Sequence, residues 1–271
     1  MTAAFAELTS RALVGVTGPD WRVFLQGLLS NDVESLAPCQ LRFAGLLTPQ
    51  GRLLFDLFVV GGEDGCRLDV AAARRQALVE RLLIYRLRAK VEIAPAEEVI
   101  CALWGTDQAP EGWMADPRLP GLGFRAIGQA PPPGAARLDE DAYDAMRLGL
   151  GAPDPARDAT PDKTYPIEAD MDLLNGIDFK KGCFVGQETT SRMKRRGGVR
   201  SRMLPIEFDG PAPAFGAEVM AGALRAGEVL TGREGRAMAL LRLDRIEGAE
   251  LSVAGRPVRV RAPAWNPAQS K

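Results

Sequence analysis

Three apolar runs separated by two turns constrain the fold of this chain more than any other feature of its sequence. Residues 41–47 and 52–60 flank residues 48–51, whose proline and glycine stand where a type I turn prefers them. A glycine-rich turn then leads into residues 66–71. This pattern predicts a three-stranded meander. Apolar residues recur at helical spacing over 73–88, which predicts a helix that covers the sheet.

Between the meander and residue 198, the sequence predicts further strands and short helices. Asp139 is expected to cap a helix that ends at the glycines after Leu148, because aspartate is a favoured N-cap and glycine ends helices. Other apolar patterns predict strands at residues 90–93, 98–104 and 124–127 and a short helix at residues 167–174. Before the meander, residues 21–29 are also predicted to form a helix.

After Gly198 the pattern changes to short alternating strands separated by glycines, which is typical of a small β-barrel or sandwich. We therefore place a domain boundary here, with residues 1–198 in one domain and residues 199–271 in a second. The length of 271 residues is consistent with this division, because domains average roughly 150 residues. The predicted fold class is α+β with an all-β C-terminal part.

The absence of histidine excludes many kinds of active site. Histidine is the usual general base and the commonest metal ligand, so Ser–His and Cys–His nucleophile pairs are impossible here. The cysteines form no C-x-x-C pair, so their spacing predicts neither a zinc module nor a redox dithiol. We predict no metal site, and we expect most of the cysteines to be reduced, buried and inert. The four are Cys39, Cys66, Cys101 and Cys183.

The sequence also predicts where the protein resides. No run approaches the roughly 18 apolar residues that a membrane span needs. The first seven residues contain an acid and no basic residue, unlike a secretory signal or an arginine-rich transit peptide. We therefore expect a cytoplasmic location and no membrane partner.

The net charge of -1 argues against a protein that binds nucleic acid over its whole surface. A local basic stretch nevertheless occupies residues 192–202, and a phosphate, polyglutamate or RNA backbone would suit it. A solvated linker between domains explains the stretch equally well, because no aromatic side chain stands among the cations to stack on bases. Its cations are Arg192, Lys194, Arg195, Arg196, Arg200 and Arg202.

Residues 178–188 hold the densest group of reactive side chains in the sequence, with two lysines, a cysteine, an amide and acids close together. If Gly186 opens a helix, the free N–H groups and the positive end of the helix dipole lie just past Cys183. Together with the two lysines they would favour the thiolate, the form that acts as a nucleophile and binds soft metals. Alternatively, Cys183 and Phe184 are buried packing residues and the glycines only mark turns.

Residues 181–188, KGCFVGQE, here called the signature octapeptide, resemble the K-G-C-[YF]-x-G-Q-E signature of the YgfZ-type folate-binding proteins. Those proteins are relatives of the glycine-cleavage aminomethyltransferase. Residues 46–52 and 85–91 resemble the branch of the family that includes the mitochondrial iron-sulfur assembly factor. The similarity spans most of residues 15–200.

The resemblance implies a ring of ferredoxin-like subdomains around a central tetrahydrofolate pocket, followed by a small C-terminal β-barrel. It also implies two candidate catalytic residues, Cys183 and Lys181. The chain departs from the superfamily at Leu148, which replaces an acid or amide, and at Asp170, which replaces an asparagine. The candidate folate-binding residues are Arg147 in the R-x-x-x-G element, Glu168 in the P-x-E element, Gln187 and Glu188.

In function, the resemblance implies a folate-binding accessory factor that supports the assembly or repair of iron-sulfur proteins, including tRNA-modifying iron-sulfur enzymes. Its partners would be folate and an iron-sulfur scaffold or client protein. One cysteine cannot hold a cluster alone, so a partner or a second chain would supply the remaining ligands. We favour this non-enzymatic role over two alternatives. These are a folate-dependent one-carbon transferase, with Asp56 and Asp69 in the region of the catalytic acid, and a tRNA-binding module that uses residues 192–202.

Overall fold

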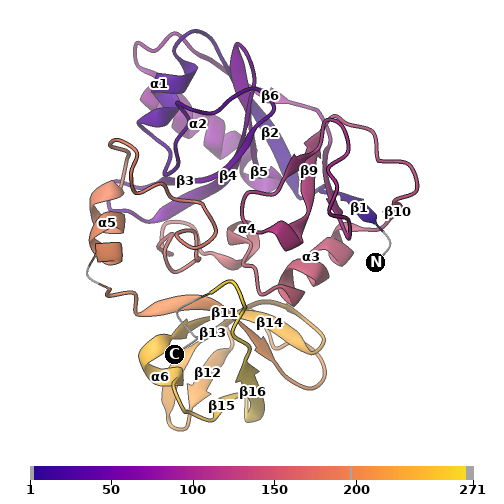
Figure 1. The fold of residues 1–271 in the computed structure, drawn as a ribbon. Helices are drawn as coiled ribbons and strands as arrows, with labels where there is room; N and C mark the ends of the chain where they lie inside the picture. Colours follow the sequence, from indigo (N-terminus) through magenta and orange to yellow (C-terminus); the bar gives the residue numbers. More distant parts are fainter. Residues whose placement is uncertain (1–2, 196, 267–271) are drawn as a thin grey trace.

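The computed structural model describes residues 3–195 and 197–266, which form two five-stranded sheets and a closed six-stranded barrel (Figure 1). Both open sheets come from residues 4–137, and the barrel comes from the last third of the chain. Helix α3 (Glu140–Gly149) packs between β1 of the second sheet and β14 of the barrel, and α4 (Pro155–Asp158) lies beside it. The predicted α+β fold with a C-terminal β-barrel is confirmed.

The first sheet is antiparallel throughout, in the order β3-β4-β5-β2-β6. It contains the predicted meander, whose first turn, residues 48–51, joins β3 to β4. Helix α2 (Arg75–Arg86), preceded by a 3₁₀ turn (Ala72–Arg74), covers this sheet as the periodicity predicts. The strands are β2 (Arg11–Thr17), β3 (Leu41–Leu47), β4 (Leu53–Gly61), β5 (Gly65–Ala71) and β6 (Glu92–Ala96).

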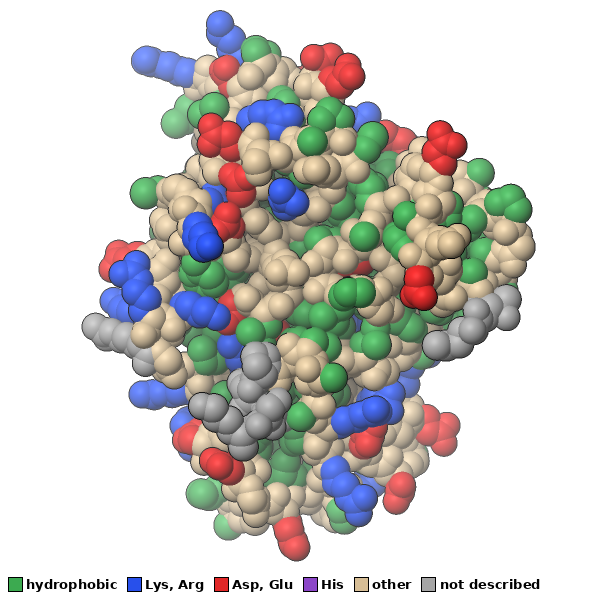
Figure 2. Space-filling view, in the orientation of Figure 1, with side chains coloured by type: hydrophobic (Ala, Val, Ile, Leu, Met, Phe, Trp, Pro, Cys, Tyr) green, Lys and Arg blue, Asp and Glu red, His purple; other side chains and the backbone are tan. Residues whose placement is uncertain are grey.

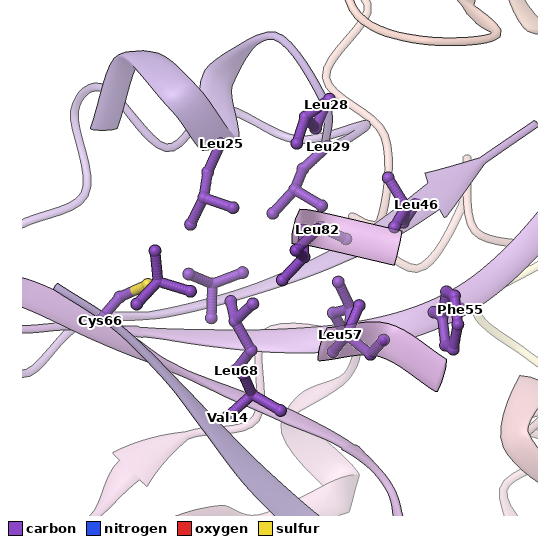
Figure 3. Close-up of a cluster of buried hydrophobic side chains, with 14 of the residues drawn as sticks. Val14, Leu25, Leu28, Leu29, Leu46, Phe55, Leu57, Cys66, Leu68 and Leu82 are labelled. Carbon is purple, nitrogen blue, oxygen red and sulfur yellow. The ribbon is translucent and has the colours of Figure 1, made fainter. Parts of the chain in front are cut away.

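Leucine side chains from α1 (Trp21–Gln26), the turn after it and α2 fill the space against one face of the first sheet (Figure 3). Leu25 and Leu82 are fully buried there, together with Leu57 of β4. Burial of one leucine side chain contributes about 1.5–3 kcal/mol, so the cluster fixes α1 against the sheet. The position of α1 matters for the site, because backbone groups at its end bind the loop that carries Cys183.

The second sheet has the order β10-β1-β7-β9-β8, and the barrel closes in the order β11-β14-β13-β12-β15-β16. The second sheet consists of β1 (Ala4–Glu7), β7 (Ile100–Trp104), β8 (Met114–Ala115), β9 (Phe124–Ile127) and β10 (Ala136–Arg137), with a 3₁₀ turn (Pro120–Leu122) before β9. The barrel consists of β11 (Ser201–Glu207), β12 (Glu218–Ala221), β13 (Leu224–Arg233), β14 (Arg236–Arg242), β15 (Leu251–Val253) and β16 (Arg256–Val260), with α6 (Leu243–Ile246) after β14.

A second apolar cluster lies on the other face of the first sheet and extends to the barrel. Phe43 of β3 and Phe58 of β4 contribute to it, with ring centroids 5.0 Å apart. Phe184 of the signature octapeptide and Met203 of β11 are buried in the same cluster. The octapeptide is therefore anchored where the first sheet meets the barrel.

Helix α5 (Gln187–Arg195) begins where the sequence predicts and packs on the turn between β3 and β4. Gly186 has a φ of +80°, and a Cβ there would lie 2.5 Å from the Thr48 carbonyl oxygen. Gly51, in the turn, has a φ of +82°, and a Cβ there would lie 2.9 Å from the Thr189 Cβ. Because neither residue has a side chain, the start of the helix and the turn can touch.

The short helix predicted at residues 167–174 is wrong, because the segment forms consecutive turns. Asp170 has a φ of +54°, a left-handed conformation that interrupts a helix. In this conformation its Oδ1 lies 2.6 Å from Arg202 Nη1, and Oδ1 of Asp172 lies 2.9 Å from the same nitrogen. Buried ion pairs between this segment and β11 thus override the local preference for a helix.

Replacement of Gly186 by alanine is expected to lower the free energy of unfolding by about 1–3 kcal/mol, because the new side chain enters a left-handed conformation against Thr48. Gly182→Ala is the matched control, since Gly182 lies in the same octapeptide but a Cβ there meets open space. Its effect should stay within about 0.5 kcal/mol. Urea denaturation of both variants measures the difference, and equal losses would show that Gly186 has no special steric role.

The stability of the protein should depend on the ionisation of Asp170. Burial raises its pKa from 3.8 to about 7, although the Arg202 charge opposes the shift. The folded state therefore holds an extra proton between these two values, and the resulting stabilisation is lost as the pH rises through about 7. Asp170→Asn is neutral at every pH. Its free energy of unfolding relative to wild type should therefore increase by more than about 1 kcal/mol between about pH 5 and about pH 8. Urea denaturation at a series of pH values checks this, and a difference that does not change with pH contradicts it.

Candidate functional site

A loop at residues 178–186 presents Cys183 at the surface. Its start is fixed by Asp178, whose Oδ1 accepts two backbone N–H groups of the loop at 2.7 and 3.2 Å. Its end is fixed by Val185, whose N–H donates to the Gly27 carbonyl oxygen at 3.2 Å. The exposed thiol therefore lies on a loop that is held at both ends.

Lys181 holds the same loop through its side chain. Its Nζ donates to three backbone carbonyl oxygens at and after the end of α1, those of Gln26 (2.8 Å), Leu29 (2.6 Å) and Asn31 (2.9 Å). The same nitrogen lies 5.4 Å from the centroid of the Phe184 ring. Burial lowers the pKa of the ammonium group to about 8. The predicted catalytic lysine thus binds backbone groups of another segment and fixes the loop in place.

The cysteines differ in their exposure. Cys183 is exposed although the next residue, Phe184, is buried, so the predicted packing role applies to the phenylalanine alone. Cys66 and Cys101 are buried strand residues, and burial raises the pKa of Cys66 to about 12. Cys39 is exposed as well. The expectation that most cysteines are buried is therefore wrong.

Gln187 and Glu188 open α5 directly after the loop. Gln187 is half-buried, and its backbone N–H donates to the Phe184 carbonyl oxygen at 3.2 Å. The Glu188 side chain is 92% exposed, 4.0 Å from the Arg192 guanidinium. Of the six predicted site residues, four therefore lie on one continuous segment with Cys183 at its centre.

The basic stretch at residues 192–202 divides into an exposed and a buried part. Figure 2 shows lysine and arginine side chains on the side of the molecule where α5 lies. Arg202, at the other end of the stretch, is buried and paired with Asp170 and Asp172. Arg196 lies outside the described residues. The exposed cations are Arg192, Lys194, Arg195 and Arg200.

Arg147 lies in a different place, at the joint between α3, α4 and the barrel. Its side chain is 1% exposed. Its Nε donates to Asp144 at 2.7 Å, and its Nη1 donates to Asp158 at 2.6 Å. Its Nη2 donates to the Thr231 hydroxyl of β13 at 2.8 Å. The resemblance assigns this guanidinium a role in folate binding, but here it makes hydrogen bonds to side chains of the protein itself.

Glu168 lies in the turn segment that contacts β11. Its Oε2 accepts the Tyr165 N–H at 2.8 Å, and its carbonyl oxygen accepts the Met203 N–H at 2.8 Å. Burial raises the pKa of its carboxyl group, although the Tyr165 N–H and the Arg52 charge oppose the shift. Glu168 does not line the cavity that Arg147 lines, and neither does Cys183. Of the predicted folate ligands, Arg147 alone lines this cavity.

The cavity beside Arg147 has a volume of about 10 Å³. This is close to the minimum that holds one water molecule and far below the roughly 300–1,000 Å³ of ligand pockets. This cavity and the residues that line it therefore do not fit the folate that the resemblance implies. Five arginines stand among the residues that line it, Arg11, Arg118, Arg125, Arg147 and Arg157.

Most of these arginines were not predicted as functional residues. A charge inside an apolar strand is the signal that could have found them, because a buried charge requires a partner. Asp56 is such a charge, in the middle of β4, and its partner is Arg11, 45 residues away along the chain. The partner cannot be identified from local sequence.

Several proteins of known name are similar to this chain over most of its length. The mitochondrial iron-sulfur cluster assembly factor IBA57 of Homo sapiens is 30% identical, over 98% of this chain and 86% of that protein. The Mus musculus protein of the same name is 31% identical, over 89% of this chain and 78% of that protein. The mitochondrial IBA57 homologue of Neurospora crassa is 32% identical over 80% of this chain, which spans only 57% of the fungal protein.

Two further comparisons concern the fold. The sequence model of one protein family, the CAF17 C-terminal β-barrel domain, matches residues 200–268. The crystal structure of the glycine cleavage system aminomethyltransferase T from Bartonella henselae has a TM-score of 0.78 and 20% identity, over 98% of this chain and 86% of that chain. At this identity the similarity shows the fold alone, and it confirms the predicted aminomethyltransferase-like fold.

The comparisons also correct one prediction. The expected cytoplasmic location is wrong, because the named relatives are mitochondrial proteins, and the charge of the first few residues was too weak a signal to decide the location. No helix among the described residues is long and apolar enough to span a lipid bilayer. The identity and coverage of the human and mouse proteins show that the chain belongs to the IBA57 family of iron-sulfur cluster assembly factors.

Proposed function

We propose that this chain is an accessory factor for the assembly or repair of iron-sulfur proteins and that Cys183 is its contact with the cluster. The observation that carries the proposal is an exposed thiol on a loop that Asp178, Lys181 and Val185 hold in place. The names of the human and mouse relatives support the same role. Service to tRNA-modifying enzymes stays a prediction.

The chemistry of the thiol suits this role. A cysteine thiolate is a soft ligand of the kind that holds iron-sulfur clusters, which usually have four protein ligands. Among the described residues, no group of three or more cysteine or carboxylate side chains is arranged to hold a metal ion. A partner protein would therefore supply the other ligands, and the cluster would be shared cargo between the two chains. Exposure of Cys183 allows such a partner to approach.

The surroundings of Cys183 favour a partner with an acidic surface. Lys180 is exposed on the same loop, and the exposed cations of α5 follow within a few residues. Opposite charges on two protein surfaces speed the association of the proteins and orient one toward the other. Contact with RNA through residues 192–202 stays a prediction.

The one-carbon transferase alternative needs a carboxylate that can exchange a proton with its substrate. Asp56 accepts from Arg11 Nη1 at 2.8 Å, and Asp69 accepts from Arg11 Nε at 2.6 Å. Asp69 is also 2.6 Å from Arg125 Nη1. Because both acids are buried and paired with arginine, the geometry favours the accessory role over the transferase.

Cys183→Ser is expected to reduce the support of iron-sulfur enzyme activity by about tenfold or more. Loss of a residue that only hydrogen-bonds to a metal ligand already has effects of that size, and loss of the ligand itself should have at least as large an effect. The measurement is the activity of an iron-sulfur enzyme in a strain that lacks its own family member and carries the variant. Cys39→Ser is the matched control, because Cys39 is also exposed but lies outside the loop. The proposal fails if the Cys183 variant supports full activity at wild-type protein levels.

Lys181→Met is expected to lower the free energy of unfolding by about 1–3 kcal/mol, because three partly buried carbonyl groups lose a charged donor. Lys180→Met is the control, since Lys180 is exposed and its side chain makes no hydrogen bond to the described residues. Its effect should stay within about 0.5 kcal/mol. Urea denaturation gives the free energies, and faster amide hydrogen exchange across residues 178–186 in the Lys181 variant alone would locate the change. If the Lys181 and Lys180 variants had the same free energy of unfolding and the same hydrogen exchange, Lys181 would not anchor the loop.

A further inference from the structure

Three arginines surround one aromatic ring at the centre of the molecule, beside the residue that the resemblance assigns to folate. The guanidinium carbons of Arg125, Arg118 and Arg11 lie 3.9, 4.8 and 5.6 Å from the centroid of the Phe58 ring. All three side chains are buried. An aromatic face is the usual platform for a flat ligand ring such as a pterin, and here guanidinium groups already surround it.

Two of the three arginines share a fully buried carboxylate. Asp69 of β5 accepts from Arg11 of β2 at 2.6 Å through one oxygen and from Arg125 of β9 at 2.6 Å through the other. Arg11 also pairs with Asp56 at 2.8 Å. Because β9 belongs to the second sheet, these pairs join the two open sheets across the centre.

Arg118 extends the same network toward α3. It makes two hydrogen bonds to Asp116, at 2.9 and 2.7 Å, and a third to the Tyr143 hydroxyl of α3 at 3.0 Å. Burial would raise the pKa of Asp116, but the Arg118 charge holds it below its ordinary value. The pair is therefore ionised, and its hydrogen bonds hold the Arg118 side chain in place.

The network leaves little space at the centre. The cavity between these arginines and Arg147 has a volume of about 10 Å³, and a neighbouring cavity beside Asp56 has a volume of about 20 Å³. Entry of a pterin ring would require at least one arginine to leave its carboxylate. Separation of a buried ion pair leaves an uncompensated charge and is strongly destabilising, so the network is a fixed part of the fold.

We propose that the centre of this molecule is closed to folate. Arg11, Arg118 and Arg125, with their aspartates, occupy the place that a pterin would need and join the surrounding elements in its stead. The inference goes beyond the proposed function and does not depend on it, because the network contains none of the residues of the Cys183 loop.

Calorimetric titration of the full chain with 5-formyltetrahydrofolate, a chemically stable reduced folate, tests the inference. We expect no saturable heat and an unchanged Tm in a parallel thermal scan. A ligand present at about 100 times its Kd would raise the Tm of a protein of this size by about 5 °C or more. Saturable binding, or a Tm increase of that size, would overturn the inference.

The folate titration and the experiment that tests the proposed function can succeed or fail independently of each other. Folate binding is measured on purified wild-type protein, whereas the accessory activity is measured in cells with Cys183→Ser and its control. Absence of folate binding, together with loss of iron-sulfur enzyme activity in the Cys183 variant but not in its control, supports both proposals. Folate binding by a protein whose activity is lost in the Cys183 variant overturns the folate inference alone.

Discussion

Buried pairs between arginine and carboxylate groups join the separate parts of this molecule. Arg125 joins the second sheet to Asp69 of the first, and Arg202 joins the barrel to the turn segment before the octapeptide. Arg147 joins α3 to Asp158 of α4, and it also donates to the Thr231 hydroxyl of the barrel. The sequence contains 28 arginines and six lysines. A guanidinium stays charged and donates in several fixed directions, so one side chain can bridge elements that a lysine could only touch at a point.

Local signals in the sequence predicted the local structure well. The meander of β3 to β5 follows from turn residues between apolar runs, and Asp139 caps α3 by accepting the Ala142 N–H at 2.8 Å. Elements that depend on distant contacts were not predictable in this way. The turns at residues 167–174 depend on the long-range ion pair of Asp170, and β15 has only three residues, too few to show alternation.

In the candidate site, too, features that depend on local sequence were predictable and features that depend on distant contacts were not. The density of reactive residues identified the segment around Cys183 and the helix that follows it, but it left open whether the thiol was exposed. The role of Lys181 was not predictable, because its partners are backbone carbonyl groups, which have no signature in the sequence. Arg147 and Glu168 occur in motifs that resemble the superfamily. Each also has a partner far along the chain, Thr231 for Arg147 and the Met203 N–H for the Glu168 carbonyl oxygen, which the local sequence does not show.

The contact between Gly51 and the start of α5 has a consequence for how variation is tolerated. Residues 46–52 and 181–188 are far apart in the sequence, but their glycines occupy one shared space, in which a Cβ on Gly51 would also lie 3.1 Å from the Gly186 carbonyl oxygen. Whether a larger residue is acceptable at one position therefore depends on the residue and backbone at the other, so substitutions there should not be additive. The two motifs therefore form one structural unit, and a chain that carries only one of them would not be expected to hold its thiol loop in this position.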